Sequence, residues 1–324
     1  MQSSILSTGS YLPEKIIYNA DLTQFPSNSI GIISQKTGIL ARRHAAPGQY
    51  TSDLAFLSAK KCLETANFSA DKVDAIIVAT SSPDRIQPAT AARVQQLLGA
   101  VNAFAFDINS VCSGGVYALA IADGLISSGK CKNILVIASE IYSRFLNPGD
   151  FSSYPYFGDG AGAVLLGEGK DKMLIKDSIL RVDGSGSDLI QIPAGGSMLP
   201  GPAVVNAKDW YFKMSGKEVF AFAVKRAPEI INELIKRNNI AKEEVTAVIT
   251  HQANINIISE IAKLTEIPFE KFFVNLEKYG NTAGASVHIA LDEYMDGKDS
   301  AESGYLVLCA FGGGLSWSAA LIKL

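Results

Sequence analysis

Two parts of the chain, each a polar loop followed by an apolar run, repeat one another at a fixed distance. The loop and run at residues 68–78 match those at residues 240–250, an offset of 172 positions. The apolar runs at 134–137 and 306–309 have the same offset. A repeat of this length predicts two halves that fold as the same unit and bury apolar surface between them. Chance similarity between generic strand and helix units is the alternative.

A third pair of segments supports the duplication. A strand-like run, a turn and a helix-like run surround both Cys112 and Asn281, which lie 169 positions apart. No long charged linker separates the halves, so we predict one fused body with halves at 1–170 and 171–324. The stretch at 184–202 is rich in Gly, Ser and Pro, and we interpret it as an excursion from the second half.

Strand-like and helix-like segments alternate along both halves. Apolar runs predict strands at 3–9, 73–80, 103–107, 133–139, 161–166, 173–182, 245–250, 305–309 and 315–322. Amphipathic patterns predict helices at 53–67, 89–98, 115–126, 215–238, 254–264 and 282–295. This order is typical of a layered α/β protein.

Charge and hydropathy exclude several classes of protein. A net charge of −3 over 324 residues gives no sign of a nucleic-acid-binding surface. The most apolar window, 101–129, contains Asp, Asn and many Gly and Ser, and would not span a membrane. The first residues have no basic segment followed by an apolar one, so we expect no signal peptide.

The cysteines and histidines favour a reducing location and no metal site. Four cysteines without a CxxC pair predict a cytoplasmic protein: Cys62, Cys112, Cys131 and Cys309. Three histidines without an HExxH pattern argue against a bound metal: His44, His251 and His288.

Cys112 lies in a turn between a strand-like run at 103–107 and a helix-like run at 115–126. The first amide groups of that helix and the positive end of its dipole favour a thiolate over a thiol. A thiolate at this place would attack an electrophilic carbonyl carbon. We therefore expect Cys112 to be a nucleophile with a lowered pKa.

Three further segments carry groups that could act with Cys112. His251 follows a predicted strand, although a lone histidine is more often a structural, hydrogen-bonded residue. Asn281 stands at the head of a predicted helix, where an N-cap is the commonest role of Asn. The glycines at 312–314 could form only a hairpin turn, or could present a backbone N–H to an oxyanion. Each signal is weak alone, but together, at the ends of predicted elements, they indicate one active site.

The chain resembles the ketoacyl synthase III condensing enzymes of the thiolase superfamily. The similarity covers nearly the whole sequence, from the Ser-Thr-Gly-Ser-Tyr-Leu-Pro motif at 7–13 to the C-terminus. It includes the segments described above and the motifs at 19–22, 37–39 and 157–163. The resemblance implies a thiolase-like α/β fold, internally duplicated in five α-β-α-β-α layers, and a homodimer.

The resemblance also implies a reaction. Cys112, His251 and Asn281 would be catalytic, and the backbone amides of Cys112 and Gly313 would form the oxyanion hole. An acyl group would be loaded on Cys112 as a thioester. A malonyl-type thioester would then lose CO₂ in a Claisen condensation that gives a 3-oxoacyl product. The substrates would be thioesters of coenzyme A or an acyl carrier protein, with no cofactor, in fatty-acid initiation or a specialised, polyketide-like pathway.

Other activities remain open on this scaffold. An acyltransferase or a non-decarboxylating condensing enzyme is the first alternative, and a catalytically silent partner subunit is the second. A Cys–His–Asn set also occurs in papain-like hydrolases. The duplication and the glycine-rich C-terminal segment do not suit that fold.

Several substrate contacts of the family are replaced in this chain. The resemblance places Phe157 in the substrate pocket, and it places Ile32, Lys36 and Phe151 where an aromatic and two arginine side chains hold the adenine of coenzyme A. An aliphatic side chain offers no stacking face, and Lys does not replace a stacked Arg. Gln87 stands where the family lends an aromatic side chain to the partner's acyl tunnel. Gln87 either faces that tunnel or points to solvent.

The surface that would receive an acyl carrier protein has few basic residues. Asn256 replaces an Arg that the family has on the helix after His251, while Lys263 remains. Such charges mostly set the association rate and the choice of partner. We expect a carrier protein as a partner, and the replacements slightly favour a specialised pathway.

Overall fold

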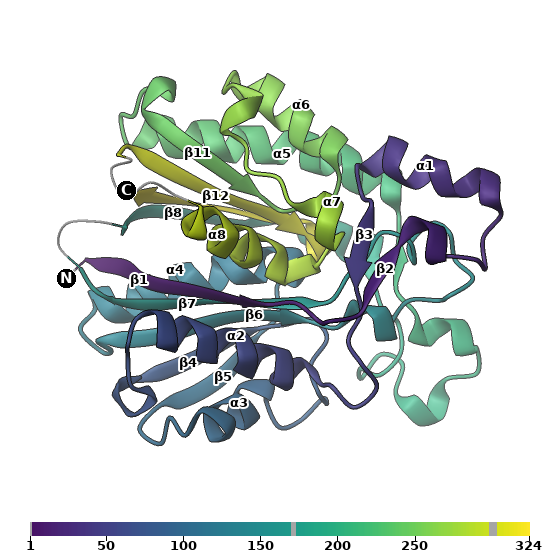
Figure 1. Ribbon diagram of the computed structural model, residues 1–324, viewed down its shortest axis with the longest axis horizontal. Helices are drawn as coiled ribbons and strands as arrows, with labels where there is room; N and C mark the ends of the chain where they lie inside the picture. The colour runs from purple at the N-terminus through teal and green to yellow at the C-terminus, as the bar shows by residue number, and fades with distance from the viewer. Residues whose placement is uncertain (1, 170–172, 298–302) are drawn as a thin grey trace.

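The computed structural model describes residues 2–169, 173–297 and 303–324, and in this part of the chain nine strands form one hydrogen-bonded sheet (Figure 1). We call the first five of these strands the N block: β1 Ser3–Tyr11, β4 Ala75–Ala79, β5 Phe104–Ile108, β6 Asn133–Glu140 and β7 Gly160–Glu168. The other four form the C block: β8 Leu174–Val182, β11 Val245–Thr250, β12 Tyr305–Gly312 and β13 Ser316–Lys323. Two short pairs lie outside the sheet: β2 Ile16–Tyr18 with β3 Ala41–Arg43, and β9 Ile190–Gln191 with β10 Lys213–Met214.

The helices lie in three layers around the two blocks, except for α1, which packs against α6, and α7, which packs against β3 (Figure 1). Their bounds are α1 Ser27–Thr37, α2 Thr51–Thr65, α3 Thr90–Leu98, α4 Gly114–Ser127, α5 Gly216–Arg237, α6 Ile255–Thr265, α7 Leu276–Tyr279 and α8 Ser286–Asp296. Helices α2 and α3 cover the outer face of the N block, and α5 and α6 cover that of the C block. Helices α4 and α8 lie between the blocks, which meet where Ser4 of β1 pairs with Leu174 of β8. This arrangement confirms the predicted five-layered, thiolase-like α/β fold.

The two blocks repeat one topology. The pairs β4–β6 and β11–β12 are parallel, and the pairs β6–β7 and β12–β13 are antiparallel. An isolated parallel bridge between Val248 and Phe272 takes the place beside β11 that β5 has beside β4. The predicted boundary at 170 and 171 falls outside the described residues.

The offset predicted for the third pair of segments needs correction. Val111 and Ala283 have the same φ of 46°, and each precedes the helix that enters the middle layer. They lie 172 positions apart, as the other two pairs do. Cys112 therefore corresponds to Gly284 and not to Asn281. A count from the sequence missed this, because the backbone conformation, not the residue type, is what the two turns share.

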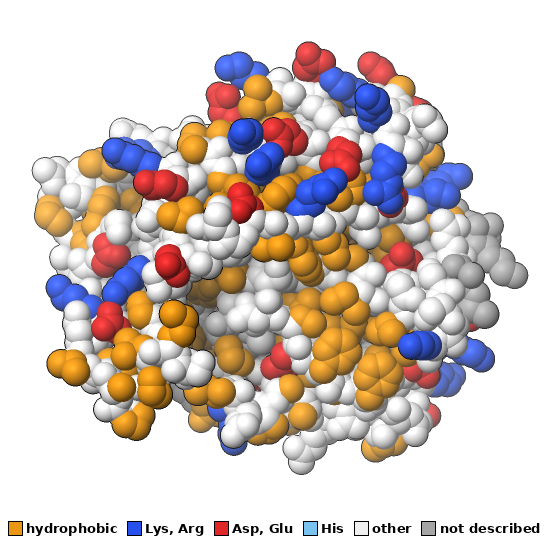
Figure 2. Space-filling model, turned by 180° about the vertical axis from the view of Figure 1, so that it is seen from behind, with side chains coloured by type: hydrophobic (Ala, Val, Ile, Leu, Met, Phe, Trp, Pro, Cys, Tyr) orange, Lys and Arg blue, Asp and Glu red, His pale blue; other side chains and the backbone are white. Residues whose placement is uncertain are grey.

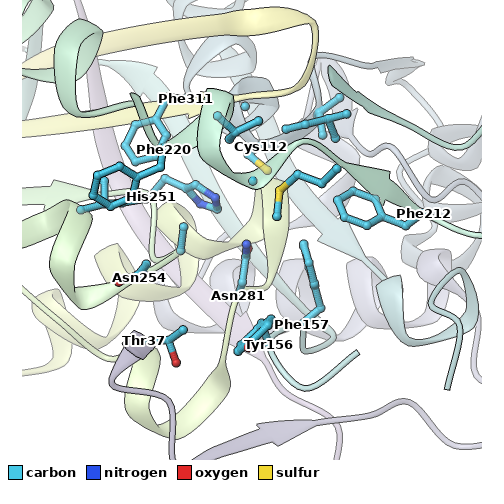
Figure 3. Close-up of a pocket in the computed structure, with 18 of the residues that line it drawn as sticks. Thr37, Cys112, Tyr156, Phe157, Phe212, Phe220, His251, Asn254, Asn281 and Phe311 are labelled. Carbon is cyan, nitrogen blue, oxygen red and sulfur yellow. The ribbon is translucent and has the colours of Figure 1, made fainter. Parts of the chain in front are cut away.

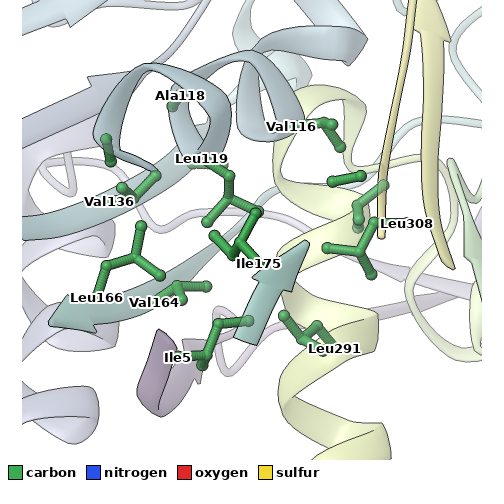
Figure 4. Packing of buried hydrophobic residues seen from close by; sticks show 14 of the residues in the cluster. Ile5, Val116, Ala118, Leu119, Val136, Val164, Leu166, Ile175, Leu291 and Leu308 are labelled. Atoms are coloured by element: carbon green, nitrogen blue, oxygen red, sulfur yellow. The ribbon is translucent and has the colours of Figure 1, made fainter. Parts of the chain in front are cut away.

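The largest apolar core lies around the middle layer (Figure 4). Leu119 of α4, Leu291 of α8, Val164 of β7 and Leu308 of β12 are at most 1% exposed. Full burial of such side chains contributes roughly 1.5–3 kcal/mol each. The middle helices are thus fixed against both blocks, and so are the turns at their N-termini.

Candidate active site

A cavity of about 270 Å³ lies beside the turn that holds Cys112 (Figure 3). Cys112, His251 and Asn281 all line it. Cys112 lies just before α4, His251 follows β11, and Asn281 precedes α8. Both halves of the chain therefore contribute to one site, and the three side chains singled out in the sequence come together there. Most of the remaining wall is apolar.

The turn at Cys112 has an unusual backbone. The φ of 46° at Val111 is in the left-handed region, which β-branched residues rarely adopt. The Val111 N–H donates to Asn109 Oδ1 at 3.2 Å, and Ser316 Oγ donates to the carbonyl of Ser110 at 3.3 Å. Such a conformation costs about 1–3 kcal/mol, so it persists only where its surroundings enforce it. These bonds, together with the buried α4, hold Cys112 at the cavity wall.

The triple-glycine segment lies against the nucleophile. A Cβ atom at Gly312 would stand 2.7 Å from the Cβ of Cys112, so only glycine lets β12 end here. Gly312 lines the cavity, whereas Gly313 is not among its lining residues. The carbonyl oxygen of Gly313 lies 3.0 Å from Ser316 Oγ, so it shares the single hydrogen of that hydroxyl with the carbonyl of Ser110. The predicted donation by the Gly313 N–H to an oxyanion stays a prediction.

Burial, and after it the nearby Glu140 carboxyl, raises the pKa of the Cys112 thiol. The N-terminus of α4 acts in the opposite direction, but a helix end contributes roughly 0.3–2 kcal/mol. This contribution is limited, and the net direction of the change in the Cys112 pKa is upward. The predicted lowering of the Cys112 pKa is therefore wrong, and Cys112 is a thiol at neutral pH. Its proton must leave as the sulfur attacks.

His251 is a neutral side chain in a buried setting. It is 3% exposed, and its ring meets that of Phe311 edge to face with centroids 5.3 Å apart. Burial lowers the pKa of His251 to about 3. Its Nδ1 lies 2.7 Å from Ser286 Oγ. An imidazole of this kind is a poor base but can act as a neutral hydrogen-bond donor.

The lowered pKa of His251 predicts a loss of stability in acid. The unfolded chain binds a proton on this ring below pH 6.5, whereas the folded chain does so only near pH 3. The contribution of the neutral His251 ring to the free energy of unfolding is therefore complete above pH 6.5 and is lost as the pH falls toward 3. The free energy of unfolding should decrease by about 2 kcal/mol from pH 7.5 to pH 5 through this group.

Urea unfolding of the wild type and of His251→Asn at the two pH values checks this prediction. Other groups titrate in both proteins, among them Glu140, whose pKa burial raises to about 7. The difference between the wild type and His251→Asn in how the free energy of unfolding changes with pH gives the contribution of His251. An identical pH dependence in both proteins would contradict the assignment of a buried neutral imidazole.

Asn281 combines a structural contact with a free donor. Its Oδ1 accepts a hydrogen bond from the backbone N–H of Ala283, two residues later, at 2.8 Å, which is an Asx-turn contact. This bond fixes the side-chain amide, and its nitrogen points into the cavity toward Cys112 and His251 (Figure 3). The N-cap interpretation of Asn281 is therefore wrong, since the N-cap of α8 is Ala285 and that of the 3-10 turn before it is Thr282. The turn contact uses only the oxygen and leaves the NH₂ group available to a ligand.

The residues expected at the substrate pocket divide into two groups. Phe157 and Lys36 line the cavity. Ile32, Phe151 and Gln87 do not, and their roles stay predictions. Phe151 packs against Phe25 and Tyr156, with ring centroids 5.2 and 6.3 Å away, so its side chain is part of an aromatic cluster. Gln87 is exposed on this chain.

Several wall residues were missed in the sequence. Ile190 comes from the excursion at 184–202, Phe212 and Met214 come from the segment between that excursion and α5, and Phe220 comes from α5. Their signal was a set of apolar residues in and after a segment otherwise rich in Gly, Ser and Pro. Nothing in their spacing indicates that this segment folds back over the nucleophile.

No group of three or more His, Cys, Asp or Glu side chains in 2–169, 173–297 and 303–324 is arranged to hold a metal ion. Within the same ranges, no helix has both the length and the hydrophobicity needed to cross a membrane.

Comparison with known proteins gives one consistent result. The family described as 3-oxoacyl-[acyl-carrier-protein] synthase III matches residues 106–184, and its C-terminal domain matches 235–324. A beta-ketoacyl-[acyl-carrier-protein] synthase III of Clostridium perfringens is 43% identical and covers 99% of both chains. The crystal structure of the 3-oxoacyl-[acyl-carrier-protein] synthase III of Aquifex aeolicus superposes with a TM-score of 0.91 at 38% identity, over 99% of this chain and 100% of that one. The priming β-ketosynthase of the R1128 polyketide pathway also has a TM-score of 0.91, at 28% identity, with 99% and 96% of the two chains covered.

Proposed function

Because the chain belongs to the 3-oxoacyl-[acyl-carrier-protein] synthase III family, it is a condensing enzyme of the acyltransferase type, and we propose that Cys112, His251 and Asn281 are its catalytic side chains. Its place is in fatty-acid initiation or a polyketide-like pathway. The observation that carries the proposal is the meeting of these three side chains in one largely apolar cavity.

In the first step the sulfur of Cys112 attacks the carbonyl carbon of an acyl thioester. A carbon–sulfur bond forms to Cys112, the bond to the donor's sulfur breaks, and the thiol proton passes to the leaving thiolate. The backbone amides of Cys112 and Gly313 are the proposed donors to the oxyanion. One such donor typically stabilises the transition state by about 3–4 kcal/mol. The apolar wall formed by Phe157, Phe212 and Met214 favours an apolar acyl group.

In the second step a malonyl-type thioester enters the same cavity. His251 and Asn281 donate hydrogen bonds to its thioester carbonyl oxygen, where negative charge develops as CO₂ leaves. The resulting enolate carbon forms a bond to the acyl carbon, and the bond to Cys112 breaks, which yields a 3-oxoacyl thioester. Neither His251 nor Asn281 changes its protonation state, in keeping with the low pKa of His251.

The test of this function is a panel of acyl thioesters on coenzyme A and on an acyl carrier protein. We expect a mass increase on Cys112 equal to one acyl group, followed by release of one CO₂ per turnover with a malonyl thioester. Acyl uptake without CO₂ release would indicate an acyltransferase instead. A protein that takes up no acyl group would be a silent subunit.

We further propose that the protein is a homodimer joined along β5. This strand is at the edge of the sheet, and it carries Phe104 at 50% exposure. Ile86 and Val101 are 82% and 75% exposed. Edge strands with exposed apolar residues are a template for pairing with a second copy. Such a pairing would also bring Gln87, next to Ile86 in the sequence, toward the partner.

Replacing Phe104 by Glu should convert the dimer into a monomer. Two carboxylates near the two-fold axis would repel each other and would be desolvated in the interface. Light scattering after gel filtration should give half the mass of the wild type. Phe269→Glu is the matched control, because Phe269 is also exposed, at 44%, but lies after α6 in the other half. A wild type that is monomeric, or a Phe104→Glu protein that stays dimeric, would overturn the proposal.

We also propose an acyl carrier protein and coenzyme A thioesters as partners, a cytoplasmic location, and two domains at 1–170 and 171–324. Basic and acidic side chains are interspersed over the upper part of the face in Figure 2. On α6, Lys263 lies 3.8 Å from Glu260, which offsets its charge. A carrier protein would thus dock with weak electrostatic attraction.

The four cysteines are free, in keeping with a reducing compartment.

A further inference from the structure

Ser286, the first residue of α8, makes a contact that neither the sequence nor the proposed function assigns. It is 1% exposed, and its Oγ lies 2.7 Å from Nδ1 of His251. The backbone N–H of Gln252 approaches the same Oγ at 3.4 Å. Among the residues that the structure describes, the Oγ has hydrogen-bond contacts with these two groups alone.

The chemistry of the three groups determines who donates. A backbone N–H can only donate, so the Oγ of Ser286 accepts from Gln252. The hydroxyl then has one hydrogen to give, and Nδ1 of His251 is the acceptor within reach. In the opposite arrangement Nδ1–H would donate to Oγ, and the hydroxyl hydrogen would be buried without an acceptor. A buried polar group left unpaired costs about 1–3 kcal/mol.

We propose that the Ser286 hydroxyl holds the proton of neutral His251 on Nε2, and so makes Ser286 a positioning residue for decarboxylation. Because Nδ1 faces Ser286, the ring presents its Nε2–H on the other side, where His251 lines the cavity (Figure 3). The other tautomer would present a lone pair to the developing enolate oxygen and repel it. This inference rests on the proposed role of His251, but the tautomer itself can be measured without catalysis.

The direct test is ¹⁵N NMR of histidine-labelled protein at pH 7.5, with His251 assigned by comparison with His251→Asn. In the wild type, Nε2 should carry the proton. In Ser286→Ala, the spectrum should change to a mixture of tautomers or to the Nδ1–H form. Ser318→Ala is the matched control, since the Ser318 hydroxyl is also buried and has no hydrogen-bond partner among the described residues. A wild-type Nδ1–H ring, or an unchanged Nε2–H ring in Ser286→Ala, would overturn the inference.

Separate rates of decarboxylation and of acyl uptake test the functional consequence. Ser286→Ala should lower decarboxylation of a malonyl thioester by about 10-fold, the loss expected from one misplaced hydrogen bond. Acyl uptake on Cys112 should stay near the wild-type rate, and Ser286→Thr, which keeps a hydroxyl, should restore much of the decarboxylation. Equal losses in both steps would refute a positioning role and leave a structural one. If the tautomer behaves as expected but the wild type releases no CO₂, the proposed function fails while the assignment of Ser286 stands. If Ser286→Ala does not fold, the wild-type spectrum still decides the tautomer.

Discussion

Replacing Cys112 by Ala should abolish acyl uptake, with a loss of at least about 1,000-fold in the rate of acyl transfer. The side chain loses only its sulfur, and the Cβ that contacts Gly312 is kept, so the fold should be unaffected. Without the sulfur no group at this turn can form the thioester. Intact-mass measurement after incubation with the acyl thioester that the wild type prefers checks the result.

The control for this experiment is Cys131→Ala. Cys131 is also a free and buried cysteine, but it lies just before β6 and does not line the cavity. The Cys131→Ala protein should accept one acyl group as the wild type does. If Cys112→Ala carried a full equivalent of acyl group, another residue would have to be the nucleophile. The Cys112→Ala protein should still decarboxylate a malonyl thioester slowly, because His251 and Asn281 are intact.

Replacing Asn281 by Asp should lower decarboxylation by about 100- to 1,000-fold, the usual effect of losing one donor to a developing oxyanion. The carboxylate keeps the oxygen that accepts from the Ala283 N–H, so the turn contact persists. The NH₂ donor is replaced by a negative charge, which opposes the enolate. Release of CO₂ from a malonyl thioester measures this step, and acyl uptake on Cys112 should continue.

Asn206→Asp provides a matched control. Its Oδ1 accepts from the N–H two residues later, at Lys208, as Asn281 does at Ala283. Asn206 is exposed and lies outside the cavity. It should leave CO₂ release unchanged. A wild-type rate of CO₂ release in Asn281→Asp would remove Asn281 from the proposed mechanism, and His251 would then have to carry the charge alone.

The amino-acid sequence determined the order of the elements and the identity of the chemical groups. Apolar runs and amphipathic periods predict β4, β6 and α4 because burial acts locally on each segment. The repeat at 172 positions predicts the two blocks, because similar segments in the same order fold into similar units. Cys112, His251 and Asn281 could be singled out because each follows or precedes a predicted element at a place where side chains reach a cleft.

The tertiary structure decided what surrounds those groups. The pKa of Cys112 is raised, because burial and Glu140 are properties of the packed interior and not of the strand–turn–helix segment. Phe212 and Met214 line the cavity only because the segment between β8 and α5 folds back over the turn. The hydroxyl of Ser286 meets Nδ1 of His251 because α8 of the middle layer is packed against the end of β11. Local patterns fix which groups a chain carries, whereas desolvation and contacts between distant segments exist only once the layers are assembled.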